Sequence, residues 1–354
     1  MDKKQEFCKY FTWSYLIFSE NYGLFSKGIN FVKIYFLVFI VLIKNKNIDI
    51  VHARGLMPNS VAIFYKFFFR YKLIFDSRGF WAEERLDNGN WNLNNFIGKF
   101  LYKYFSYVEK KSFIQSEKVI FLTHKARERI ILKYGINPDK TYVLPCVADY
   151  NKFKILNDVD RISILKSLNI DNSNFLFLYI GSINKIYNPE LMIDFFIKFN
   201  KIKTAQILFI TFDKIKLKKF LKKKLNRSLL SKVILLNSDE IDIYKVLSIC
   251  DYSLSFIYPS IARIASSPTK IGESLASGVP MITIKGVGDC DSILDKIKYN
   301  VLLNTKQNDY FNIFPKLRKF NFEEKKYIRI KSKKYYDLEL AITILKSIYH
   351  NLKS

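Results

Sequence analysis

The chain has 354 residues, of which 49% are hydrophobic and 16% aromatic, and this length and composition predict about two globular domains with sizeable cores. Lysine and arginine number 58 against 32 acidic residues, and the net charge of +26 favours anionic partners such as phosphorylated substrates, acidic lipid or nucleic acid. The four cysteines form no CxxC pair and only three histidines are present, which argues against a disulfide framework and a histidine-based metal centre.

The most apolar run of the chain is IYFLVFIVLI at residues 34–43. Its ten residues are too few to span a bilayer, which needs about 20. We predict a buried helix, with a role at a membrane surface as the alternative. No secretory signal is recognisable upstream. We therefore expect a cytoplasmic protein, with peripheral attachment to the inner face of the membrane as a further option.

Short apolar runs alternate with helical patterns along most of the chain. The runs predict strands at 49–52, 72–75, 118–122, 142–144, 175–180, 206–210, 233–236, 252–256 and 281–284. Helices are expected at 125–134 and 189–200. Strands that alternate with helices form parallel sheets covered on both faces. The alternation stops between about residues 151 and 174, where we place a linker. The predicted fold class is α/β, with two doubly wound, Rossmann-like domains that face a cleft.

The stretch SSPTKIGESLASGVP places a cation and a carboxylate at a helix start. Pro268 can begin the helix, Ser267 and Thr269 can cap it, and free N–H groups there attract anions. Lys270 adds a mobile positive charge that suits phosphate oxygens. Glu273, one turn later, can accept two hydrogen bonds from a ribose diol. The pattern predicts a nucleoside-diphosphate site, and an ordinary capped helix with a surface Lys–Glu pair is the alternative.

The longer segment SPTKIGESLASGVPMITIKGVGD resembles the donor site of glycosyltransferase family 4, whose enzymes have the two-domain GT-B fold. The S-P-T-K-x-x-E form resembles bacterial polysaccharide-biosynthesis members. The usual segment carries two glutamates; here the second is Glu273, and Ala265, eight residues earlier, replaces the first. YIGSINKIYNPELMIDF resembles the start of the family's donor domain. There the resemblance implies that the N–H groups of Gly181 and Ser182 face the diphosphate and that Lys185 supplies a charge; a plain strand-to-helix turn is the alternative.

Two segments of the N-terminal half, DIVHARG and FDSRGFWAEE, resemble the same subgroup. The resemblance implies that Asp76, Arg78 and Glu84 project from a strand end into the cleft as catalytic residues. His52 is a further catalytic candidate. The alternatives are a structural ion pair between Asp76 and Arg78 and a satisfied core histidine at His52. Many family members carry a histidine near the position of Asp76, and this chain does not.

The resemblance also implies the domain boundaries. We expect an acceptor-side domain at 1–155, a nucleotide-sugar donor domain at 156–330, and a C-terminal helix at 331–354 that crosses back to the first domain. Only 48 residues precede DIVHARG, so the N-terminal domain is expected to be shortened or its start incomplete. A strand at 11–18 and a reduced loop at 21–24 would replace the usual strand, glycine-rich loop and helix.

The implied activity is transfer of a sugar from a nucleotide-diphosphate sugar to a glycan or lipid-linked acceptor, with retention, no cofactor and no bound metal. Asp289-Cys290-Asp291 spells DxD, a pattern of metal-dependent transferases of another fold, but we favour a polar loop. The basic run KIKLKKFLKKKLNR is interpreted as a solvated helix face, with attraction to anionic lipid as the alternative. Two other function classes stay open. One is an inactive or accessory GT-B scaffold; the other is a basic nucleic-acid-binding protein, although no RRM, zinc-finger or KH signature is present.

Overall fold

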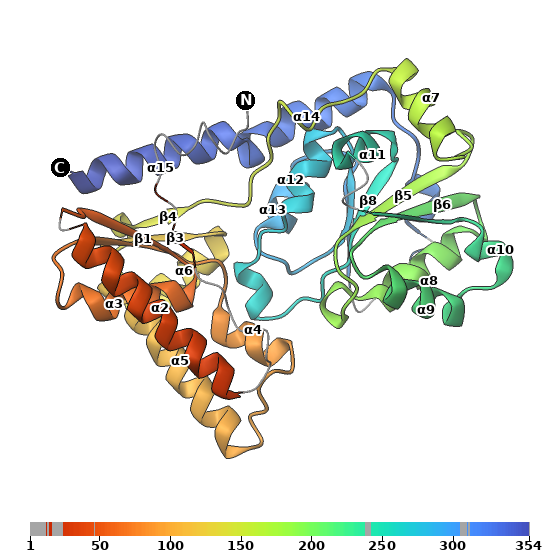
Figure 1. The fold of residues 1–354 in the computed structure, drawn as a ribbon. Helices are drawn as coiled ribbons and strands as arrows, with labels where there is room; N and C mark the ends of the chain where they lie inside the picture. Colours follow the sequence, from red (N-terminus) through yellow and green to blue (C-terminus); the bar gives the residue numbers. More distant parts are fainter. Residues whose placement is uncertain are drawn as a thin grey trace.

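The computed structural model describes residues 12, 14–15, 24–45, 47–237, 242–304, 310 and 312–353. Apart from residues 12, 14, 15 and 24, the predicted strand at 11–18 and loop at 21–24 lie outside the described residues. The described chain forms two α/β units, each built on a parallel sheet, and the two units lie side by side (Figure 1). The prediction of two α/β units with separate sheets is confirmed.

The first sheet has the strand order β1-β2-β3-β4, and all its strands are parallel. Its strands are β1 (Ile50–Arg54), β2 (Lys72–Asp76), β3 (Lys118–Phe121) and β4 (Thr141–Val143). The connecting elements are α3 (Leu56–Lys66), α4 (Trp81–Asp87), α5 (Phe96–Gln115), α6 (His124–Tyr134) and the 3₁₀ turn η1 (Pro138–Lys140). Because each strand pairs with its successor and such crossovers are right-handed, the connecting helices all fall on one face. The four described strands therefore follow one another in one direction across the sheet.

The other face of the first sheet is covered by the C-terminal end of the chain. Residues expected to form one final helix form two, α14 (Phe322–Tyr336) and α15 (Leu338–Lys353), which join at Asp337 (Figure 1). Side chains alternate across the strands, so Ile74 and Ile120 pack in one cluster with α15, and their neighbours face α3 and α5. The last helix thus lies on the first sheet although α14 packs on the second unit.

The second sheet has the order β10-β9-β8-β5-β6-β7, again all parallel. Its strands are β5 (Phe175–Ile180), β6 (Ala205–Ile210), β7 (Val233–Leu236), β8 (Tyr252–Ser255), β9 (Met281–Ile284) and β10 (Val301–Leu303). Its helices and 3₁₀ turns are α7 (Asp158–Ser167), η2 (Lys185–Tyr187), α8 (Pro189–Phe199), α9 (Lys214–Lys224), α10 (Arg227–Leu230), α11 (Ile243–Ile249), η3 (Ala262–Ala265), α12 (Thr269–Ala276), α13 (Cys290–Leu294) and η4 (Phe314–Lys316). The order reverses between β5 and β8, so this sheet is doubly wound, and ligands of such sheets bind at the reversal.

Two sequence-based interpretations change in the structure. The expected linker at 151–174 contains α7, and Leu165 of this helix is buried in the hydrophobic core of the second unit. The run at 34–43 belongs to α2 (Leu24–Lys44), where Leu42 is buried but Phe36 and Ile43 are exposed. The prediction of a buried helix is therefore wrong for one side of α2, which no other described element covers. Within the described residues, no helix is long and apolar enough to cross a membrane.

The basic run 214–227 forms α9 and the start of α10. Leu217 and Leu221 of α9 are buried in the hydrophobic core of the second unit, and most of the lysines of α9 are exposed. This is the amphipathic pattern of a helix with one solvated face, as predicted.

The two units are joined by a carboxylate at the N-terminus of α6. Asp289 accepts hydrogen bonds from the backbone N–H of His124 (2.6 Å) and Lys125 (3.2 Å). Asp291 accepts one from Gly286 N (3.0 Å) and pairs with Lys125 Nζ at 3.6 Å. Both carboxylates of the DxD sequence therefore bind backbone N–H donors, and Asp289 acts as a helix cap supplied by the other unit.

We expect Asp289→Ala to lower the free energy of unfolding by about 1–2 kcal/mol, the usual cost of a lost helix cap. The matched control is Asp194→Ala, which removes only a half-buried pair with Lys198 (2.8 Å) within one helix and is expected to cost less than about 0.5 kcal/mol. Urea unfolding of both variants measures the difference. Equal effects would show that Asp289 contributes no more than a surface charge.

Candidate functional site

A cavity of about 430 Å³ lies beyond the carboxyl ends of β5 and β8, where the strand order of the second sheet reverses. We call it the lysine cavity, after Lys270. Arg78 and Cys146 of the first unit line it together with Lys270 and Glu273 of the second. Its position is the one at which doubly wound sheets bind ligands.

The start of α12 opens into the lysine cavity without a side-chain cap. Pro268 is the N-cap residue, and no side chain that the structure describes hydrogen-bonds the N–H groups of the first turn. Ser267, which we expected to cap this helix, instead accepts a hydrogen bond from Cys146 N at 3.1 Å. Thr269 is exposed and lines the cavity. Because uncapped helix starts carry free donors and a positive dipole end, this one can bind an anion.

Lys270 is buried, and its Nζ has no hydrogen-bond partner in the described part of the chain. Nζ lies 4.6 Å from the ring centre of Tyr179 and 4.7 Å from that of Tyr187. Burial lowers the pKa of Lys270 to about 7. The two ring faces attract the ammonium and act in the opposite direction. The result is a cation that lacks a counter-ion and lines a cavity.

Gly181 follows β5 with φ +141°, a backbone conformation that favours glycine. A side chain there would come within 3.6 Å of Lys270 Nζ. Ser182 is exposed, and its carbonyl accepts a hydrogen bond from Tyr179 Oη at 2.7 Å. Lys185 is exposed and lies outside the set of residues that line the lysine cavity. The structure thus brings Gly181 to Lys270 but leaves Lys185 apart.

Glu273 lies half-buried in the wall of the lysine cavity, and burial raises the pKa of its carboxyl group. Ala265, where the resemblance leads one to expect the first carboxylate, is buried in an apolar cluster with Phe75 and Phe80 of the first unit. A glutamate at this position would put a charge into that cluster, which is costly without a partner.

Arg263 is a cavity residue that the sequence did not single out. It lines the lysine cavity, and its Nε lies 3.8 Å from Asp87 Oδ2 of the first unit. The sequence signal that could have pointed to Arg263 was its position two residues before Ala265. Arg263 adds a second cation, after Lys270, from the donor-side unit.

A second cavity, of about 550 Å³, adjoins the first. We call it the histidine cavity because His52 lines it with Asp76 and Arg78. Arg78, Cys146 and Thr269 line both cavities. The candidate catalytic and donor-binding side chains therefore meet at Arg78, across the boundary between the two units.

Asp76 ends β2 and is buried between two cations. Its Oδ1 lies 3.6 Å from Arg78 Nη1, and its Oδ2 lies 3.8 Å from Arg54 Nε. Oδ1 accepts no hydrogen bond from any residue that the structure describes. Arg54 is the last residue but one of the DIVHARG segment, and its position at the end of β1 was the sequence signal for it. Asp76 is thus a buried carboxylate that is paired with two arginines and has one oxygen without a hydrogen-bond donor among the described residues.

His52 lies within β1, two residues before its end, whereas the predicted strand at 49–52 ended at His52. Its Nδ1 is 2.7 Å from Tyr349 Oη of α15. Burial lowers the pKa of His52, so the ring is neutral at neutral pH. Its Nε2 is buried and has no partner among the described residues. No sequence signal pointed to Tyr349, because only the packing of α15 on the first sheet brings it here.

Glu84 on α4 does not share this cavity. Its carboxyl group lies against the backbone of Gly79, and it is absent from the linings of both cavities. Burial raises the pKa of Glu84, and Arg263 opposes this shift. The structure thus groups Asp76, Arg78 and His52 and sets Glu84 apart from them.

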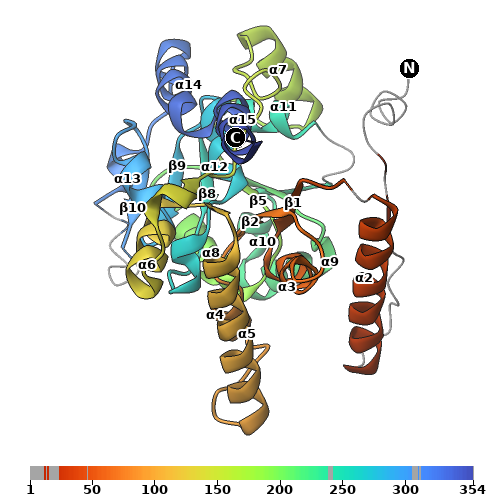
Figure 2. The ribbon, with the colours of Figure 1, turned by 90° about the vertical axis from the view of Figure 1, so that its left-hand side faces the viewer.

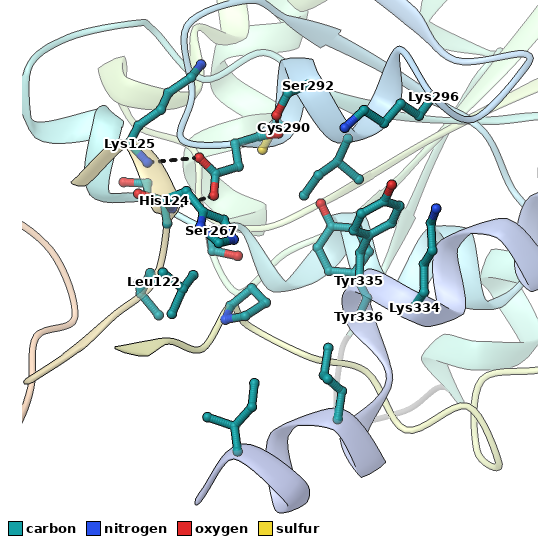
Figure 3. Close-up of a pocket in the computed structure, with 18 of the residues that line it drawn as sticks. Leu122, His124, Lys125, Ser267, Cys290, Ser292, Lys296, Lys334, Tyr335 and Tyr336 are labelled. Carbon is teal, nitrogen blue, oxygen red and sulfur yellow. Dashed lines mark hydrogen bonds between the residues drawn. The ribbon is translucent and has the colours of Figure 1, made fainter. Parts of the chain in front are cut away.

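A third cavity, of about 540 Å³, lies between α6, α13 and the junction of α14 and α15 (Figure 3). Ser267 is the one predicted donor-binding residue in its lining. Figure 3 shows Lys125, Lys296 and Lys334 around it. Neither Lys270 nor Glu273 lines this cavity, which shares Ser267 with the lysine cavity.

Two family profiles match consecutive parts of the chain. The profile described as Glycosyltransferase Family 4 matches residues 14–152, and the one described as Glycosyl transferases group 1 matches residues 160–312. The search of curated proteins found no match.

Several solved structures share the fold at low sequence identity. Sucrose-phosphate synthase from Thermosynechococcus elongatus is 13% identical with a TM-score of 0.69, over 92% of this chain and 78% of that one. HepE from Anabaena, solved in complex with UDP-glucose, is 16% identical with a TM-score of 0.67, over 90% and 82%. A glycosyltransferase from Rickettsia africae is 15% identical with a TM-score of 0.66, over 100% and 88%.

Two parallel sheets that meet at a shared site define the GT-B architecture, which these structures also have. The chain belongs to glycosyltransferase family 4. It is therefore an enzyme that transfers a sugar from a nucleotide sugar.

Proposed function

We propose that this glycosyltransferase moves a sugar from a nucleoside-diphosphate sugar to a lipid-linked glycan in bacterial polysaccharide biosynthesis, with retention at the anomeric carbon and without a bound metal. Residues 1–155 would bind the acceptor, residues 156–330 the donor, and residues 331–354 would tie the C-terminus to the acceptor side. The observation that carries the proposal is the buried, unpartnered ammonium of Lys270 in a cavity at the start of α12.

The donor's diphosphate is placed at Lys270 and the first N–H groups of α12. Ser182 adds a backbone donor, since a strand end with glycine permits close approach of phosphate. The N–H of Gly181, expected to face the diphosphate as well, donates instead to the carbonyl of Ile210 at 3.0 Å. Ser267 and Thr269 offer hydroxyl groups on the same turn. These groups all favour negative charge. Lys185, which is exposed, would reach the diphosphate only by a movement of its loop.

The ribose is placed at Glu273, whose carboxylate can accept hydrogen bonds from both ribose hydroxyls. UDP-glucose is the first donor to test, because HepE from Anabaena was solved with it. A bound diphosphate would raise the pKa of Lys270 from about 7 and hold the side chain charged.

The transfer step develops negative charge on the departing diphosphate. The acceptor oxygen forms its bond to the anomeric carbon on the face that the diphosphate leaves, and the hydroxyl proton passes to a diphosphate oxygen. Lys270, Arg78 and the α12 dipole stabilise the departing charge, which is the role that a metal ion has in other transferases. Asp76 accepts a hydrogen bond from a neighbouring hydroxyl of the acceptor sugar and so orients the reacting hydroxyl, and neutral His52 lines the same cavity.

The test is turnover of a panel of nucleotide sugars, UDP-glucose first, with a lipid-linked glycan acceptor in detergent. We expect release of the nucleoside diphosphate with one donor, unchanged rates in EDTA, and a product with the anomeric configuration of the donor by NMR. An inverted product would overturn the assignment of retention. Loss of turnover in EDTA that magnesium restores would overturn the metal-independent assignment.

A non-catalytic GT-B scaffold is the second candidate, and Ala265 is the observation that favours it. The carboxylate expected at this position is absent, and the residue packs into an apolar cluster instead. A scaffold would bind a nucleotide sugar in calorimetric titration but release no nucleoside diphosphate with any nucleotide sugar of the panel.

A further inference from the structure

Helix α2 exposes a stripe of large apolar side chains. Val32, Phe36, Phe39 and Ile43 are all exposed. Their spacing of three and four residues puts them on one face of the helix. In Figure 2, α2 stands at the outside of the first unit, away from the second. Burial of one side of α2 therefore leaves an apolar face toward the surroundings.

Helix α5 carries a second stripe of the same kind. Ile97, Phe100, Tyr104 and Tyr107 are exposed and follow the same spacing. In Figures 1 and 2 the N-terminal half of α5 projects beyond the rest of the first unit. The helix thus presents aromatic rings at a protruding edge.

A groove of about 750 Å³ lies beside these stripes, and Tyr104 and Tyr107 of the α5 stripe line it. Side chains of α2, α3 and α5 line it, among them Tyr35, Phe64 and Tyr104. The rings of Tyr35 and Phe64 are in contact at 5.4 Å between centres. Phe67 and Phe68, at the end of α3, are also exposed. We call this groove and the exposed apolar side chains of the three helices the aromatic surface.

The charges around the aromatic surface have one sign. The sequences of α2, α3 and α5 contain no aspartate or glutamate except Glu109, which is buried. The same helices carry exposed lysines at positions that include Lys33, Lys99 and Lys103. A second copy of the chain would bring these lysines against each other, so self-association through this surface is opposed by like charge.

We propose that the aromatic surface docks onto an anionic lipid bilayer. Aromatic side chains partition into the headgroup region, and lysines beside them attract anionic lipid while their stems cover apolar surface. A water-exposed apolar surface of this extent marks an interaction site. The inference rests on the proposed function in one respect, since a lipid-linked acceptor gives the enzyme a reason to bind a membrane. It assigns the membrane contact to α2, α3 and α5 instead of the lysine-rich α9.

The experiment uses the full chain and co-sedimentation with vesicles of phosphatidylcholine that contain, or lack, about one third phosphatidylglycerol. The double variant Phe96→Ser with Ile97→Ser changes side chains that are 84% and 70% exposed on α5. The control, Phe212→Ser with Ile215→Ser, changes side chains that are 81% and 77% exposed beside α9. Because all four side chains are exposed, both proteins are expected to fold, which thermal unfolding checks.

We expect the wild-type protein to bind the anionic vesicles and to lose at least about tenfold in affinity in the α5 variant, with less than about twofold change in the control. High salt is expected to weaken binding. Charge reversal gives a second comparison between α5 and α9. Lys99→Glu with Lys103→Glu on α5 should weaken vesicle binding more than Lys218→Glu with Lys219→Glu on α9.

The proposal fails if the wild-type protein does not bind anionic vesicles, or if the α9 variants lose binding while the α5 variants keep it. It also fails if the protein is a dimer without vesicles and Phe96→Ser with Ile97→Ser makes it a monomer. Donor turnover in detergent is measured separately. Turnover without vesicle binding would leave the proposed function standing and remove only the docking surface.

Discussion

Methionine in place of Lys270 is expected to stabilise the ligand-free protein and to abolish productive donor binding. The ammonium is buried without a hydrogen-bond partner in the described residues, and its removal relieves the cost of burying a charge. Replacement of poorly compensated buried charges by apolar side chains gains about 1–4 kcal/mol. The same change removes the cation from the lysine cavity, and we expect kcat/KM to fall by about 100-fold or more.

The gain in stability should depend on pH. The pKa of Lys270 is about 7 in the folded protein against its ordinary 10.5, so between these values the unfolded chain binds more protons. The free energy of unfolding of the wild-type protein therefore rises with pH in this window, relative to the variant. The advantage of methionine is largest below pH 7 and decreases toward pH 10.5. Urea unfolding at pH 6 and pH 9 measures it.

Lys325 provides the matched control for this experiment. It is also buried, and burial lowers its pKa, but its Nζ donates a hydrogen bond to the carbonyl of Ser248 at 3.2 Å. Lys325→Met leaves that carbonyl without its donor, and we expect no gain in stability. An equal gain in both variants would mean that the unpartnered state of Lys270 is not the cause.

Asparagine in place of Asp76 is expected to lower kcat by about 100-fold or more while donor affinity changes less than about threefold. Asp76 lines the histidine cavity and not the lysine cavity, so its charge serves the acceptor hydroxyl and not the diphosphate. Steady-state kinetics and donor titration together separate the two effects.

Glu84→Gln is the control for Asp76, since Glu84 lies outside both cavities against Gly79. We expect its kcat to stay within about threefold of the wild-type value. A loss equal to that of Asp76→Asn would assign Glu84 a catalytic role and contradict the geometry described above.

Much of the fold followed from local patterns. Every strand predicted from a short apolar run between residues 49 and 284 is present, because a strand buried on both faces needs a continuous apolar sequence. β10 has only three residues and gave no such signal. The winding of the first sheet and the break at Asp337 depend on pairing between distant segments. α2 was misjudged because an apolar run does not reveal whether a partner covers all its sides.

The candidate site was predictable only where its residues are neighbours in sequence. The segment around Lys270 and Glu273 could be recognised because its sequence predicts a helix start next to a strand. Tyr179 and Tyr187, which flank the Lys270 ammonium, could not be found this way, since only the turn after β5 brings them there. Asp289 likewise caps a helix more than 160 positions away, which no spacing rule detects.

The central claim is that Lys270 binds the donor's diphosphate and Glu273 its ribose. Calorimetric titration of uridine, UMP and UDP, or of the matching series for the donor that the panel selects, tests it most directly. We expect Lys270→Met to remove most of the affinity that the diphosphate adds, and Glu273→Ala to weaken all three ligands by a similar factor of about ten. If Lys270→Met loses equal affinity for all three ligands, or for none, the phosphate role of Lys270 is contradicted.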